Sequence, residues 1–376
     1  MIVHQLKQEA GKNDWEFSSI PELRTDYQLV LVFGSRLLLG EHAWYRSLSD
    51  RFPDAKIVSV STSGNILQEE VSDESLVASL IFLEKTSIRT VVTNMANQFS
   101  SYDAGIDIAS HLDEAGLCHM FVFSDGAKVN GSELVRGLSR NLKVPVTGGL
   151  AGDGPRFEKT LVGLDSVPSE GNIVGIGFYG DQLSVGFSYF GGWDPFGPER
   201  VVTKSAGNIL YELDGKSALE LYKNYLGEKA KELPGSALLF PLSMRTEASG
   251  LPLTRTILSI NSDGGMVFAG DLPEGAIVQL MKANFEKLID ASTVAAEKSF
   301  SQMPHGAEFA LLISCVGRKL VLGQRIEEEV EAVREVLGPE PVMAGFYSYG
   351  EISSQSGFMK CELHNQTMTI TMMKEV

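Results

Sequence analysis

Short apolar runs alternate with amphipathic stretches along most of the chain, a pattern typical of proteins that mix strands and helices. The run at 27–35, YQLVLVFGS, is rich in β-branched residues and predicts a buried strand, followed by a helix at 37–51 and a second strand at 55–61. Strands at 76–83 and 88–95 then follow each other without a helix between them. Strands joined in this way pair antiparallel or cross between sheets, which counts against a purely parallel doubly wound fold.

The same alternation predicts the remaining elements. In the first half they are helices at 101–116 and 132–142 and strands at 119–123, 144–147, 171–179 and 183–190. In the second half they are helices at 217–226, 284–299 and 325–337, strands at 237–242, 255–260, 265–269, 276–282, 308–314 and 341–345, and a terminal hairpin. The segment 191–198, GGWDPFGP, is crowded with glycine and proline and predicts the boundary between two lobes.

These elements predict an α/β (α+β) fold with two related lobes of mixed or antiparallel sheets covered by helices. A layered α-β-β-α sandwich is one such arrangement. The residues at 1–26 mix charge and polarity, and we expect them to form a poorly ordered lead-in. An N-terminal lobe at 27–192 and a C-terminal lobe at 193–376 follow.

Two stretches, 119–154 and 309–351, share one order of motifs. Each has an apolar strand, a polar turn, a helix, a second strand and a glycine-rich turn: FVFSDG precedes VPVTGGLAGDG, and LLISCVG precedes EPVMAGFYSYGE. We interpret them as related units, one in each lobe, that face each other across a single cleft. Chance similarity between generic β-α-β units is the alternative.

Composition restricts the function classes. The 376 residues contain 32 Lys and Arg against 48 Asp and Glu, a net charge of −16 that repels nucleic acid. The sequence has no run of eighteen apolar residues and no signal-peptide core, so we expect a cytoplasmic protein without membrane insertion. Cys118, Cys315 and Cys361 lack C-x-x-C spacing, which argues against disulfides and a cysteine zinc site.

Common cofactor and catalytic motifs do not match. The glycine cluster at 148–154 lacks the G-x-G-x-x-G spacing of a dinucleotide site, and GFYSYG around Ser348 has one residue too many for a nucleophile elbow. The six histidines lack metal-ligand spacing, so no preformed metal site is predicted. A haem needs only one or two axial ligands, and His364 and His119 are the candidates for that role.

The order of the motifs resembles the FIST family of intracellular sensory domains, over about 27–370. The strings that carry the resemblance are STSGNI, FSDG and GGLAGDG in the first half, and GWDPFGPERVVTKSAGNILYELDGKSALELY, LPEGAIVQL, LLISCVGRKLVLG, GFYSYGEI and NQTMTI in the second. The resemblance implies N-terminal and C-terminal FIST portions that bind small ligands for signalling, with amino acids as the favoured ligand class. Some members of the family bind haem, sense nitric oxide and govern a partner histidine kinase.

We therefore predict a sensor that binds a small, amino-acid-like ligand in the cleft between its lobes. Only TMMKEV follows the family-like region, so we expect a separate signalling partner such as a histidine kinase. Arg318 would pair with a ligand carboxylate, acids such as Asp125 would take an amino group, and the tyrosines would form the walls. The predicted lining is Ser63, Asn65, Ser124, Asp125, Gly149 and Asp153 from one lobe, and Cys315, Arg318, Tyr347, Tyr349, Glu351 and Asn365 from the other.

Two alternatives stay open beside this hypothesis, which assigns no catalytic residue and no cofactor. One is a haem-based nitric-oxide sensor that regulates a histidine kinase, with His364 or His119 as axial ligand. The other is an enzyme acting on a small molecule through Glu351, or through Cys315 as a thiolate activated by the nearby Arg318.

Overall fold

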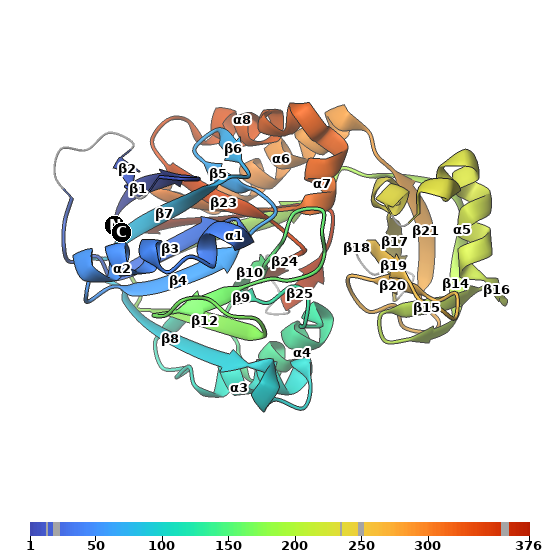
Figure 1. The fold of residues 1–376 in the computed structure, drawn as a ribbon, viewed down its shortest axis with the longest axis horizontal. Coiled ribbons are helices and arrows are strands. Elements are labelled where there is room, and N and C mark those ends of the chain that lie inside the picture. Colours follow the sequence, from blue (N-terminus) through green and yellow to red (C-terminus); the bar gives the residue numbers. More distant parts are fainter. Residues whose placement is uncertain (13, 18–22, 234, 247–251, 355–360) are drawn as a thin grey trace.

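The computed structural model describes residues 1–376 except 13, 18–22, 234, 247–251 and 355–360. Figure 1 shows two parts: a large body, formed by residues 1–193 and 283–376, and an inserted lobe, formed by residues 194–282. Within the described residues, three six-stranded sheets make up the body and one eight-stranded sheet makes up the inserted lobe.

Each sheet of the body contains the same arrangement of three strands. Two parallel strands are joined through helices, and a later strand pairs antiparallel with the first of them. The first strands are β3 (Leu29–Gly34), β9 (Leu117–Ser124) and β22 (Phe309–Cys315). The second strands are β4 (Lys56–Ser61), β10 (Val146–Leu150) and β23 (Val342–Ser348). The antiparallel strands are β7 (Ser75–Phe82), β12 (Asn172–Tyr179) and β26 (Met368–Glu375).

Helices cover the outer face of each sheet (Figure 1). They are α1 (Arg36–Leu39) and α2 (Ala43–Arg51) over β3, α3 (Ser101–Ser110) and α4 (Gly131–Asn141) over β9, and α6 (Phe285–Phe300), α7 (Val316–Leu322) and α8 (Ile326–Leu337) over β22. Local sequence sets where they start: Asn130 caps α4 and Asn284 caps α6, each accepting backbone N–H groups of the first turn.

The three sheets exchange strands. After each second strand the chain turns and adds its next strand to a different sheet: β5 (Asn65–Leu67) pairs with β23, β11 (Val162–Leu164) pairs with β4, and β24 (Gly350–Ser354) pairs with β10. The outer strands are β1 (Ile2–Glu9), β2 (Glu16–Phe17), β6 (Glu70–Ser72), β8 (Ser87–Asn94), β13 (Leu183–Phe190) and β25 (Cys361–His364). This exchange binds the sheets into one body.

The inner faces of the sheets meet in one apolar core. Phe33 of β3, Phe123 of β9 and Phe346 of β23 are fully buried there. Their ring centroids lie 4.9 Å apart for Phe33 and Phe346 and 6.1 Å apart for the other two pairs. The first strands are mostly apolar and buried along almost their whole length, because one face packs on helices and the other on the neighbouring sheets.

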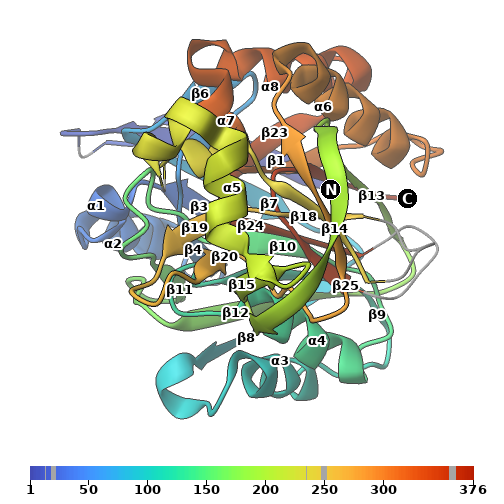
Figure 2. The ribbon, with the colours of Figure 1, turned by 90° about the vertical axis from the view of Figure 1, so that its right-hand side faces the viewer.

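The inserted lobe is connected to the body through a two-stranded ribbon. β14 (Asp194–Ala206) begins the lobe and β21 (Ile277–Lys282) ends it, with Asp194 opposite Lys282. The other elements are β15 (Ile209–Leu213), β16 (Lys216–Ser217), β17 (Leu242–Arg245), β18 (Leu253–Arg255), β19 (Ile257–Ile260), β20 (Met266–Phe268), α5 (Ala218–Leu226) and two 3₁₀ helices, η2 (Gly227–Glu232) and η3 (Gly235–Leu239). Figure 2 looks onto this lobe, with α5 across its strands. The lobe has its own apolar core.

The predicted fold class is confirmed, with mixed and antiparallel sheets covered by helices in two lobes. The body has three sheets, where a layered α-β-β-α sandwich would have two. The expectation of a poorly ordered lead-in is wrong for Ile2–Glu9, which forms β1 and pairs with β7 along its whole length. In its sequence, IVHQLKQE, burial alternates as in an amphipathic strand except at Gln5 and Leu6, which are both buried.

The predicted division into consecutive lobes at 192 and 193 also differs from the structure. The chain enters the inserted lobe at Asp194, but after Lys282 it returns and completes sheets that the first half began. Both proposed repeat units occur, as the pairs β9–β10 and β22–β23, and both lie in the body. A third copy, β3–β4, escaped notice because hydroxyl residues stand where the other two copies have glycines.

Replacing Phe346 with alanine should lower the free energy of unfolding by about 3–5 kcal/mol, because a large cavity would open where the three sheets meet. Denaturant unfolding measures the change. Phe285→Ala is the matched control, since that side chain is 47% exposed. Equal losses in both variants would contradict a shared core at Phe346.

Candidate functional site

The residues predicted to line a cleft are buried inside the body. They are Ser63, Asn65, Ser124, Asp125, Gly149, Asp153, Cys315, Arg318, Tyr347, Tyr349, Glu351 and Asn365. The structure does bring their turns together: the Ser63 N–H donates to the Tyr347 carbonyl at 2.8 Å, and the Gly152 N–H donates to the Ser61 carbonyl at 2.8 Å. The structure has a cavity between the body and the inserted lobe, and none of these predicted residues lines it.

Arg318 is enclosed by protein acceptors. Its Nε and Nη2 donate to Oε2 of Glu329 at 3.0 and 2.7 Å. Its Nη1 donates to the Gly191 carbonyl at 2.7 Å, and Nη2 also donates to the Leu288 carbonyl and the Ser292 hydroxyl. Arg318 and Glu329 are both fully buried. The guanidinium is therefore committed to this network instead of facing a ligand carboxylate.

The second oxygen of Glu329 completes the same network. The Tyr347 hydroxyl donates to its Oε1 at 2.8 Å and the Ser314 hydroxyl at 3.0 Å. Burial raises the pKa of Tyr347 well above its usual value, and the neighbouring carboxylate adds to that effect. Tyr347 is thus a neutral donor inside the fold and does not form a wall of the cavity.

Glu351 sits in a separate buried cluster. The Ser348 hydroxyl donates to its Oε1 at 2.7 Å, and the Thr367 N–H and hydroxyl donate to its Oε2 at 3.1 and 2.9 Å. Burial raises the pKa of Glu351 to about 8. Burial also raises the pKa of Cys315, with the Glu351 carboxyl as a further cause. A thiol whose pKa is raised is a poor nucleophile at neutral pH, which weighs against the enzyme alternative through Cys315.

The remaining predicted residues, apart from Asn365, lie in or beside tight turns and contact them. Asp125 accepts the N–H groups of Ala127, Lys128 and Gly171, each at 2.7 Å. Asp153 forms ion pairs with Arg156 at 2.7 Å and with Arg36 at 3.3 Å. Ser63 Oγ accepts the Gly154 N–H at 3.0 Å, and the Tyr349 hydroxyl donates to the Gly154 carbonyl at 3.0 Å. Asn65 donates to the Ser75 carbonyl at 2.8 Å, and Ser124 Oγ donates to the Asp125 carbonyl at 3.4 Å. Gly149 packs where a Cβ would lie 2.9 Å from Ile313. These residues satisfy buried polar groups.

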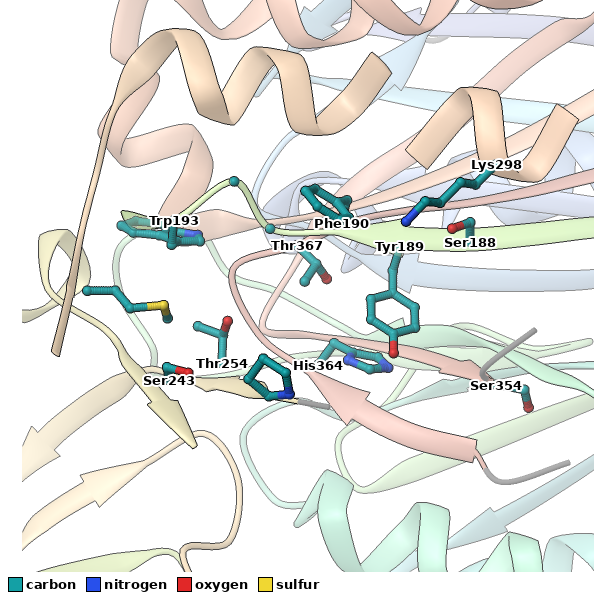
Figure 3. A pocket seen from close by; sticks show the side chains of 14 residues that line it. Ser188, Tyr189, Phe190, Trp193, Ser243, Thr254, Lys298, Ser354, His364 and Thr367 are labelled. Carbon is teal, nitrogen blue, oxygen red and sulfur yellow. The ribbon is translucent and has the colours of Figure 1, made fainter. Parts of the chain in front are cut away.

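A cavity of about 450 Å³ lies between the body and the inserted lobe (Figure 3). We call it the first cavity. The body contributes Ser188, Tyr189, Phe190, Gly191, Gly192, Trp193, Lys298, Ser354, His364 and Thr367, and the inserted lobe contributes Ser243, Pro252, Thr254 and Met281. Its volume is within the range of roughly 300–1,000 Å³ that is usual for small-molecule sites.

Lys298 supplies the charge of the first cavity. The side chain extends from the last turn of α6, and its ammonium lies 4.8 Å from the centroid of the Phe190 ring. The described lining residues include no Asp or Glu, so the cavity favours a negatively charged ligand group. Phe190 lies beside Lys298, whereas Tyr189 lies on the other side of the strand, next to His364, and Trp193 lies further along the chain (Figure 3).

The turn that begins at His364 carries several buried polar atoms without a hydrogen-bond partner in the protein. They are Nε2 of His364, both amide atoms of Asn365 and Oε1 of Gln366. Such atoms are rare, and each needs a partner from solvent or a ligand. Gln366 has a φ of 62° and also links the two parts: its carbonyl accepts from Trp193 Nε1 at 2.9 Å, and its Nε2 donates to the Leu238 carbonyl at 3.2 Å.

The two histidines considered as haem ligands are both buried, in different surroundings. His119 is sealed in the core, with Nε2 2.9 Å from the Thr147 hydroxyl. His364 borders the first cavity, but the Tyr189 ring stacks on it with 3.7 Å between ring centroids. Burial lowers the pKa of each histidine to about 3, so both are neutral near pH 7.

Sequence reasoning placed a cleft between two lobes but missed the residues that line it, apart from His364. The aromatic residues of the cavity come from YFGGW (189–193), which spans the end of the predicted strand 183–190 and the start of the predicted boundary 191–198. The remaining lining residues are single positions on separate strands and helices, with no common motif. The aromatic cluster around Gly191 and Gly192 was the one signal that marked the site.

Two further features, a metal-binding cluster and a membrane-spanning helix, are absent from the described part of the chain. No group of three or more His, Cys, Asp and Glu side chains there is arranged to hold a metal ion. No helix in that part is both long and apolar enough to cross a membrane.

Comparisons with known proteins match nearly the whole chain. A FIST N domain model matches residues 28–216, and a FIST C domain model matches residues 218–354. An uncharacterised protein of Methanocaldococcus jannaschii is 28% identical over 229 residues, which cover 57% of this chain and 43% of the relative. An uncharacterised protein of Mycobacterium tuberculosis is 24% identical over 220 residues, which cover 56% of this chain and 57% of the relative. The matches thus span about half the length of these relatives.

The raised pKa of Glu351 should make stability depend on pH. Between pH values of about 4.5 and 8 the folded protein keeps a proton that the unfolded chain has lost, so stability falls as pH rises, by up to about 1.4 kcal/mol per unit. Glu351→Gln removes this titration and should gain stability relative to the parent from about pH 6 to about pH 7.5.

Urea unfolding at both pH values measures the difference. Glu335→Gln, on the exposed side of α8, controls for the loss of one carboxylate from an acidic protein. If the stability gap between Glu351→Gln and the parent stays constant with pH, Glu351 is ionised in the folded state and the assignment is wrong.

Proposed function

Because the chain belongs to the FIST family, whose domains are associated with signal-transduction sensing, we propose that it is a cytoplasmic sensor for a small amino-acid-like carboxylate. The ligand binds in the first cavity, between the body and the inserted lobe, and a separate signalling protein such as a histidine kinase receives the signal. The observation that carries the proposal is a cavity of small-molecule size whose described lining holds a lysine and no carboxylate.

The first cavity supports a carboxylate with an apolar side chain. Lys298 offers a charge-assisted hydrogen bond to the carboxylate, which is stronger than one between neutral groups. Tyr189 and Trp193 offer flat apolar surface for the side chain, and each also has a polar edge. Neutral His364 adds a ring nitrogen, Nε2, that has no hydrogen-bond partner in the protein.

The amino group of such a ligand finds only neutral acceptors. The hydroxyls of Ser188, Ser243 and Thr254 are among the described lining groups, which include no Asp or Glu. A deaminated analogue should therefore keep most of the affinity of the parent amino acid. We rank the carboxylate as the group that decides recognition, and the ammonium as secondary.

A ligand bound between the two parts would signal to a partner protein by changing the relative position of the parts. A ligand that touches both Lys298 of the body and Ser243 of the inserted lobe stabilises one relative position of the parts. Trp193, in the connection between them, lines the cavity and reports on the same event. This family role needs no catalytic residue, and we propose none.

Lys298→Gln should weaken binding of the most effective carboxylate by at least about tenfold, or about 1.4 kcal/mol, because it removes the positive charge while keeping a polar side chain. The screen pairs phenylalanine and leucine with their deaminated acids and follows melting temperature and Trp193 fluorescence, since only a ligand of the folded state raises the melting point. Calorimetric titration then gives the affinities of the parent and the variant.

Lys231→Gln is the control, because Lys231 is an exposed lysine of the inserted lobe that pairs with Glu228. Equal affinity in the parent and Lys298→Gln would overturn the site. An absorption spectrum after haem supplementation, taken on the same sample, tests the gas-sensor alternative. A Soret band lost in His364→Ala would replace the carboxylate proposal.

A further inference from the structure

The ribbon that connects the two parts has a cavity on each face. Successive residues of a strand point to opposite faces, and the ribbon follows this rule. Met281 lines the first cavity, whereas the next residue, Lys282, lines another cavity of about 600 Å³. Asp194, which pairs with Lys282 across the ribbon, lines that second cavity too. The two cavities share none of their lining residues.

The second cavity is also lined by residues of both parts. Its lining is Lys229, Leu239 and Phe240 from the inserted lobe, Asp194 and Lys282 of the ribbon, and Ala283, Asn284, Phe285 and Val321 from the body. It therefore depends, like the first, on how the lobe sits against the body. Nothing in the sensor function described above uses it.

Its charge balance is positive, in a protein whose net charge is −16. Asp194, the carboxylate of the described lining, forms an ion pair with Lys287. Lys229 and Lys282 form no ion pair within 4.0 Å among the described residues, although many other lysines of the chain do. Two ammonium groups at one cavity thus stay available for anionic partners.

The walls beside these charges are aromatic. The Lys229 ammonium lies 5.3 Å from the centroid of the Phe240 ring, and Phe285, at 47% exposed, is among the most exposed large apolar side chains of the chain. Leu239 and Val321 extend the apolar surface. A ligand with a flat apolar body would cover Phe240 and Phe285 while its charges meet the lysines.

We propose that the second cavity is a binding site for a small organic anion with two negative charges on an apolar or aromatic body, the class of the aromatic dicarboxylates. The two lysines give it a charge requirement that the first cavity, with Lys298 alone, does not have. The site is separate from the first cavity and stands whether or not a carboxylate binds there.

Phthalate is the probe, titrated by calorimetry into the full chain, with benzoate as the single-charge comparison. We expect saturable phthalate binding that is at least about tenfold tighter than benzoate binding. The double variant Lys229→Gln, Lys282→Gln should lose at least about tenfold in phthalate affinity. Both lysines are exposed, so the variant should fold, and its melting curve verifies this.

Two controls separate this site from the first cavity and from general charge effects. Lys231→Gln should keep phthalate affinity within about twofold of the parent, and Lys298→Gln should keep within about twofold the phthalate binding that the double variant loses. Loss in Lys298→Gln instead of the double variant would assign the dianion to the first cavity and overturn the proposal. Absence of saturable binding, or equal affinity in the double variant and the parent, would overturn it as well.

Discussion

Because the three sheets exchange strands, the turns after β4, β10 and β23 lie in the middle of the body and are surrounded by protein. A polar atom left unpaired in such a place costs roughly 1–3 kcal/mol, so each turn must carry its own partners. Ser63, after β4, accepts the N–H of Gly154 in the turn after β10, and Tyr349, after β23, donates to the Gly154 carbonyl. The three sheets can meet only because polar residues at these strand ends supply partners for the buried backbone groups.

The glycines near the same turns follow from the same crowding. A Cβ on Gly148 would lie 1.9 Å from the Val122 carbonyl oxygen, and one on Gly345 would lie 1.8 Å from the Leu312 carbonyl oxygen. These are matching positions in β10 and β23, each facing the first strand of its unit. Glycine is present because the backbones approach too closely for any side chain.

This crowding explains both what the sequence predicts well and what it does not. The strands, helices and repeat units follow from local periodicity, and β9, β10, β22 and β23 lie within a few residues of their predicted ranges. A hydroxyl or carboxylate at a strand end, however, looks the same whether it faces a ligand or a neighbouring turn. Arg318 was assigned to a ligand carboxylate, and only the fold shows that Glu329, eleven residues along the chain, is its partner. The lining of the first cavity could not be predicted from the sequence, because Lys298, Thr254 and His364 come together only through the packing of the inserted lobe on the body.

Arg318 also connects this interior to the region between the two parts. Its Nη1 donates to the carbonyl of Gly191, at the start of the connection that carries Trp193 into the first cavity. On the other side of the cavity, Arg255 of the inserted lobe donates to the carbonyl of Leu363, the residue before His364. The strand end that carries His364 is thus held by the lobe, while the connection is held by the core. Since a ligand between these supports contacts both parts, its binding free energy depends on their relative position, and by linkage its presence must bias that position.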